Sequence, residues 1–92
     1  MADWVPGAPR SRIRELDIEG EITLYDGSSQ AAVVLNSTAS DVWRLLDGQR
    51  SIDDIVALLR IAYDTDLDTL RMDVRRTVEE LRRHDLLEDA TQ

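Results

Sequence analysis

Apolar and polar residues alternate one by one in the first third of the chain and recur every three or four residues after it. Leu16 and Ile18 alternate with acidic residues, and Ile22 and Leu24 follow in the same rhythm. A period of two is typical of a strand with one buried face. A third strand is predicted over Ala31–Leu35, a β-prone run without the Lys, Glu, Pro or Gly that protect a sheet edge. This part of the chain therefore predicts three strands, the last with an open edge.

Two turns connect these strands into a predicted antiparallel meander. Glu19–Glu21 is expected to form a three-residue hairpin loop, with Ile18 opposite Ile22. Asp26–Ser29 is expected to form the second loop, because it is dense in turn-forming residues. In this arrangement one face of the sheet collects Leu16, Ile18, Ile22, Leu24, Ala31, Val33 and Leu35.

Three helices are predicted after the strands. Asn36 or Ser37 caps the first helix, and Asp47-Gly48 ends it. Ser51, with an acidic residue three positions on, resembles the capping box of a second helix. The third helix covers about residues 67–84. The chain is thus predicted to be an α+β domain, with a three-stranded antiparallel sheet followed by a three-helix winged-helix-type core in the order βββααα.

The third predicted helix has an apolar stripe whose two borders differ in charge. At about 100° per residue, the stripe contains Leu67, Leu70, Val74, Val78 and Leu81. One border carries Arg71, Arg75 and Arg82, and the other carries Asp73, Thr77, Glu80 and His84. We predict that the arginine border frames a groove with Val74 and Val78 as its floor and the third strand as its far wall. The alternative is three solvated arginines without a ligand.

The composition indicates one small domain. With 92 residues, 42% of them hydrophobic and none of them Phe, the chain needs nearly all its aliphatic side chains for a single core. We expect residues 1–11 to be a flexible tail, residues 12–88 to be the domain and residues 89–92 to be a polar end. No apolar run approaches the ~20 residues of a membrane span, and a signal peptide is not recognisable. These features predict a cytoplasmic protein that does not enter membranes.

Charge and candidate chemistry narrow the classes of function. A net charge of −8 argues against nucleic-acid binding, which needs a basic surface. The absence of Cys excludes disulfides and thiolate chemistry. The single His84 has no nucleophile assigned to it, and Asp64, Asp66 and Asp68 match only the opening of a calcium-binding loop. We therefore predict no catalytic residue, no metal site, no cofactor and no enzymatic activity.

Several short motifs, in order and at matching spacing, resemble the PqqD-like family of precursor-peptide recognition elements. The motifs are Val34-Leu35-Asn36-Ser37-Thr38-Ala39, Val42-Trp43, Leu45-Leu46-Asp47-Gly48, Ile52, Ile55, Tyr63-Asp64, Asp66 and Asp73-Val74. The resemblance covers about residues 16–88. It departs from the family at Asp85, where Gly is usual, and at Ala31-Ala32, where bulkier residues are common.

The resemblance implies a peptide-binding module in the biosynthesis of ribosomally made, modified natural products. A leader peptide would add as a fourth strand along the third strand, and a separate tailoring enzyme such as a radical-SAM enzyme, a cyclase or a leader peptidase would then receive it. The expected peptide-binding residues are Ala31, Ala32, Val33, Val34, Leu35, Arg71, Val74, Arg75, Val78 and Arg82. An acidic leader would complement the arginines.

Two alternatives remain open at this point. The arrangement of the three helices is also that of a winged-helix DNA-binding regulator, although the acidic charge argues against it. The buried face of the third strand is either that of Ala31, Val33 and Leu35 or that of Ala32 and Val34.

Overall fold

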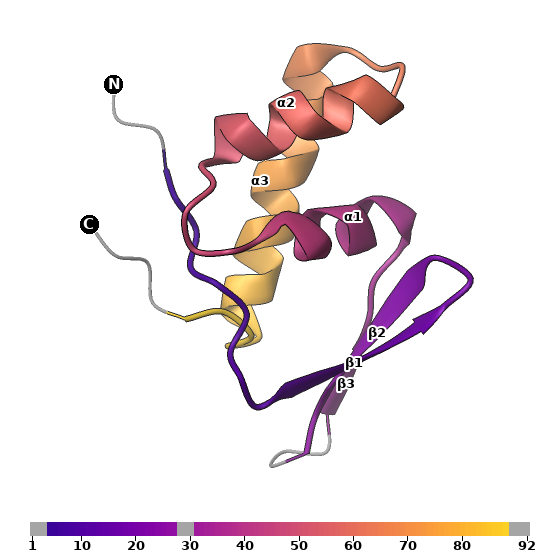
Figure 1. Ribbon diagram of the computed structural model, residues 1–92, viewed down its shortest axis with the longest axis vertical. Helices are drawn as coiled ribbons and strands as arrows, with labels where there is room; N and C mark the ends of the chain where they lie inside the picture. Colours follow the sequence, from indigo (N-terminus) through magenta and orange to yellow (C-terminus); the bar gives the residue numbers. More distant parts are fainter. Residues whose placement is uncertain (1–3, 28–30, 89–92) are drawn as a thin grey trace.

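The computed structural model describes residues 4–27 and 31–88, and its elements follow one another in the order βββααα (Figure 1). The elements are β1 (Ile13–Ile18), β2 (Glu21–Asp26), β3 (Ala31–Val34), α1 (Ser37–Leu45), α2 (Ile52–Ala62) and α3 (Leu67–Arg83). The three strands form one antiparallel sheet in the order β1-β2-β3, so β1 and β3 are its edges. The predicted fold class is confirmed.

Short polar side chains begin each helix, as the sequence predicts. Asn36 is the N-cap of α1, and its side-chain oxygen accepts a hydrogen bond from the Ala39 amide at 2.8 Å. Ser51 and Asp54 form a reciprocal capping box at the start of α2. Asp66 caps α3. These bonds satisfy amides that have no partner inside the helix, so the local sequence sets where each helix starts.

The core lies between the helices and the inner face of β2. It consists of Ile22, Leu24, Leu35, Val42, Trp43, Leu46, Ile52, Ile55, Val56, Leu59, Leu70, Val74, Val78, Leu81, Leu86 and Leu87. The predicted stripe of α3 is confirmed, with Leu67 at its partly buried end. Trp43 is buried, and its indole N–H donates to the carboxylate of Glu15 at 2.7 Å. Trp43 is therefore a core residue whose only polar atom has a partner.

The hairpin between β1 and β2 is shorter than predicted. Its loop is Glu19-Gly20, and Ile18 pairs with Glu21 rather than with Ile22. Both loop residues have positive φ, 53° for Glu19 and 89° for Gly20, as in a type I′ turn. Such turns match the twist of paired strands, which favours the two-residue loop over the predicted three-residue one.

In this register, the inner and outer faces of β1 are exchanged relative to the prediction. Leu16 and Ile18 are 60% and 57% exposed, so they do not join the core face. Glu15 and Asp17 point toward α1 instead, and Asp17 pairs with Arg44 at 2.6 Å. The predicted placement of the apolar residues of β1 is therefore wrong, because its acidic residues have partners on the helix.

The pairing of β3 with β2 decides which face of β3 is buried. Val33 lies opposite Leu24, on the core side, and Leu35 continues that side. Val34 lies on the other face and is 71% exposed. The core face of β3 is thus the one with Val33 and Leu35. The predicted turn before β3 falls partly outside the described residues.

The segment before β1 packs against the segment after α3, along the left of Figure 1. The Arg10 amide donates to the Leu86 carbonyl at 3.0 Å, and the Glu88 amide donates to the Ala8 carbonyl at 2.7 Å. Gly7 lies so close to Glu88 that an added Cβ would be 2.0 Å from its carbonyl oxygen. Residues 4–10, which belong to the predicted flexible tail, are therefore packed against the rest of the domain. Residues 1–3 and 89–92 lie outside the described part of the chain.

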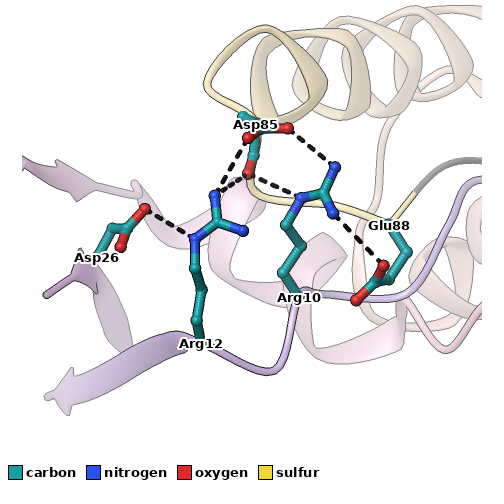
Figure 2. A network of polar contacts seen from close by, with 5 residues as sticks. All are labelled: Arg10, Arg12, Asp26, Asp85 and Glu88. Carbon is teal, nitrogen blue, oxygen red and sulfur yellow. Dashed lines mark hydrogen bonds and ion pairs between the residues drawn. The ribbon is translucent and has the colours of Figure 1, made fainter. Parts of the chain in front are cut away.

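Side chains reinforce this contact (Figure 2). Arg10 contacts Asp85 at 2.9 Å and Glu88 at 3.5 Å, while Arg12 bridges Asp85 and Asp26 at 3.1 Å each. Hydrogen bonds from Arg10 and then Arg12 hold the pKa of Asp85 below its ordinary value. The network joins the start of β1, the end of β2 and the turn after α3.

Candidate functional site

The outer edge of β3 presents backbone groups that β2 does not use. The Leu35 amide donates to the Ile22 carbonyl at 2.8 Å, which places these two residues in a hydrogen-bonded pair. Because such pairs alternate along an antiparallel ladder, Val33 also bonds to β2, whereas Ala32 and Val34 direct their N–H and C=O groups outward. The edge thus offers two donors and two acceptors to a further strand.

A groove of about 460 Å³ lies between this edge and α3. Its lining comes from β3, from the start of α1 and from one face of α3. The lining residues are Val33, Val34, Leu35, Asn36, Thr38, Ala39, Asp73, Arg76, Thr77, Glu80, Leu81 and His84. An extended peptide beside β3 would lie over this groove.

The hydroxyl of Ser40 connects the start of α1 to the ends of β2 and β3. Ser40 is fully buried; its hydroxyl oxygen accepts from the Ile22 amide at 2.9 Å, and its O–H donates to the Leu35 carbonyl at 3.4 Å. Only Leu35 and the cap residue Asn36 separate β3 from α1. These bonds therefore hold β3 and the start of α1 close together on one side of the groove.

The α3 side of the groove is polar and more acidic than basic. Asp73 and Arg76 are paired at 3.6 Å, and Glu80 is 3.9 Å from Arg83, which does not line the groove. Two carboxylates and one guanidinium thus face the space beside β3. These pairs are largely exposed, so each can exchange its partner for a ligand at low cost.

The predicted floor of the groove is wrong. Val74 and Val78 are both 0% exposed and belong to the core behind α3. Leu35 and Leu81 supply the apolar lining instead. Val74 and Val78 support the groove from inside the protein, where a ligand does not reach them.

The predicted position of the arginine border is also wrong. Arg71 pairs with Asp53 of α2 at 3.0 Å. The guanidinium of Arg82 lies 5.2 Å from the ring centroid of Trp4, near the N-terminal segment. Arg75 is exposed and does not line the groove. The arginine border faces α2 and the N-terminal segment, away from β3.

The border of α3 opposite the arginines therefore forms the α3 side of the groove. It contributes Asp73, Thr77, Glu80 and His84, together with Arg76. The 3.6-residue period identifies both borders but not the side on which the sheet lies, because that depends on how the helices cross. Among the predicted residues of the strand, Val33, Val34 and Leu35 line the groove, and Ala32 contributes its backbone at the edge.

Residues 4–27 and 31–88 contain no group of three or more His, Asp or Glu side chains that could hold a metal ion. No helix within these ranges combines the length and the apolar character needed to cross a membrane.

Comparisons with known proteins agree with this fold. The family model for coenzyme PQQ synthesis protein D (PqqD) matches residues 21–87. The solved structure of TbiB1 in complex with the TbiA(beta) leader peptide has a TM-score of 0.80 and 22% sequence identity, covering 92% of this chain and 99% of that chain. Lasso peptide synthetase B1 complexed with the leader peptide has a TM-score of 0.76 and 22% identity, covering 87% and 94%. At this identity the two structures show a shared fold. No curated protein matches the chain.

Proposed function

Because the chain belongs to the PqqD family, we propose that it is a non-catalytic module that binds the leader of a ribosomally made precursor peptide. The module presents this leader to a separate enzyme, of a class such as a radical-SAM enzyme, a cyclase or a leader peptidase, in the cytoplasm. Both similar structures are complexes with a leader peptide, which supports the proposal.

The observation that carries the proposal is the open edge of β3 beside a groove. A leader in extended conformation would pair with the outward groups of Ala32 and Val34 and become a fourth strand. Backbone hydrogen bonds would supply affinity that depends little on the leader sequence. Alternate side chains of the leader would enter the groove and supply specificity.

The groove defines the chemistry of the leader that it would accept. Leader side chains on the same face as Val33 point toward α3, where Leu35 and Leu81 favour an apolar anchor. Asp73 and Glu80 favour a basic residue beside that anchor. The preferred leader is therefore basic rather than acidic. The prediction of an acidic leader depended on the arginine border lying at the groove.

Proline at the edge of β3 tests strand addition. Ala32→Pro and Val34→Pro each remove an outward N–H without touching a bond to β2. We expect each to weaken binding of a fluorescein-labelled synthetic leader by about tenfold or more in fluorescence polarisation.

Ala32→Ser and Val34→Thr keep the N–H groups and serve as matched controls that should bind like the wild type. Circular dichroism verifies that each variant is folded. If both proline variants are folded and bind the leader with wild-type affinity, strand addition to β3 is wrong.

A further inference from the structure

The outer face of the sheet carries four large apolar side chains, interspersed with Arg14, Glu21 and Thr23, although it faces solvent. Leu16, Thr23 and Val34 form one row across the three strands, and Arg14, Tyr25 and Ala32 form the next. Leu16, Ile18, Tyr25 and Val34 are all exposed large hydrophobic residues, between 45% and 71%. In Figure 1 all three helices lie on the other side of the sheet.

This face is not explained by folding. The β1–β2 register places acidic residues of β1 toward the helix and apolar ones toward water, which is the reverse of a half-buried strand. Contiguous exposed apolar surface on a small domain marks a site of interaction.

We propose that this outer sheet face, defined by Leu16, Ile18, Tyr25 and Val34, docks the enzyme that acts on the bound precursor. This inference rests on the proposed function and adds the surface through which the leader is handed on. The enzyme would present an apolar patch with an acidic residue at its border.

Continuity with the leader strand identifies the occupant. A leader paired with β3 would place alternate side chains in line with Val34 and Ala32, so it would extend the row that begins at Leu16. A protein covering this face would touch the domain and the leader together. An enzyme that recognises the loaded module needs such a joint surface, because it distinguishes the bound state from the free one.

Charge supports a protein enzyme over other occupants. The net charge of −8 repels a second copy of the chain, an anionic membrane and nucleic acid. Arg14, at the border of the face, has no ion pair with another residue in the described part of the chain. It is therefore available to a carboxylate on the enzyme.

The experiment uses the full chain, a synthetic precursor peptide that the chain binds and the purified enzyme that processes this precursor. Leu16→Glu places a charge in the face while leaving the edge of β3 intact. Ile61→Glu is the matched control, because Ile61 is an apolar residue of α2 that is 85% exposed. Processing is measured with the module at limiting concentration, and leader binding is measured by fluorescence polarisation.

We expect Leu16→Glu to bind the leader like the wild type but to slow processing at least about tenfold, whereas Ile61→Glu changes neither. Normal leader binding with normal processing in Leu16→Glu would overturn the inference and leave the proposed function standing. Absence of leader binding in the wild type would overturn the proposed function itself. Sedimentation of the wild type as a dimer that Leu16→Glu dissociates would assign the face to self-association and would also overturn it.

Discussion

Arg75 and Arg76 show how one position along α3 changes what a side chain can do. Arg76 lines the groove and pairs with Asp73, whereas Arg75 is exposed outside it. The two side chains are chemically identical and about 100° apart around the helix. Their difference in role is therefore a matter of orientation alone, and it offers a test with its own control.

We expect Arg76→Glu to tighten binding of a basic leader by about twofold to fivefold, because it adds an acidic residue to the groove. Arg75→Glu should change the affinity by less than about twofold, since that position does not face the leader. Fluorescence polarisation at low and high salt measures both effects. Equal changes in the two variants would show that the charge of the whole molecule, and not the groove, governs binding.

The β1–β2 hairpin decides which side chains the sheet offers to solvent. Its two-residue turn places Glu15 and Asp17 toward α1, where Trp43 and Arg44 bind them. The Asp17 carboxylate also accepts from the Gly20 amide at 3.0 Å, and these bonds lower its pKa, with Arg44 as the largest cause. Turn geometry and side-chain bonding thus favour the same register.

Gly20→Ala is expected to lower the free energy of unfolding by about 1 kcal/mol, because the φ of 89° at Gly20 is unfavourable for Ala. No atom lies within 4 Å of the added Cβ, so the cost comes from the backbone alone. Gly27→Ala is the control, since its Cβ is equally free and its φ is not in that region. Urea denaturation measures both, and an equal loss at Gly27 would rule out the turn as the cause.

The two ends of the domain depend on each other. The segment before β1 and the segment after α3 exchange backbone hydrogen bonds, and Asp85 binds both Arg10 and Arg12 (Figure 2). Asp85 has a φ of 60°, the left-handed conformation that Gly, usual here in the family, adopts without strain. The carboxylate therefore brings contacts to a position where the backbone favours Gly.

These contacts should make stability depend on pH. The pKa of Asp85 is lowered in the folded state, first by Arg10 and then by Arg12, so its stabilising contribution is present above the unfolded-state pKa and is lost as the pH falls through the folded-state value. Asp85→Asn keeps a residue that tolerates positive φ but removes the charge. We expect this variant to be less stable than the wild type near pH 7, with a difference that shrinks in urea denaturation as the pH falls through the folded-state pKa of Asp85. A difference that is independent of pH would assign the loss to packing instead.

Local sequence was sufficient for the helices and for the order of the elements. Caps such as Asn36 and Ser51, and the apolar stripe of α3, act within a few residues of themselves, so their consequences follow from spacing. The open edge of β3 was predictable for the same reason, because it depends on which residues the strand lacks. The family resemblance rests on these same local motifs.

Contacts between residues far apart in the sequence decided how the helices, the sheet and the N-terminal segment face one another. The side of α3 that faces β3 depends on how the helices cross, so the period alone could not choose between the arginine border and the border with Asp73 and Glu80. Which face of β1 points inward was decided by its partners in α1. Whether residues 4–10 pack against the domain was decided by the segment at the other end of the chain. A periodic pattern specifies which side chains share a face, whereas the identity of what packs against that face is set only when the whole chain is assembled.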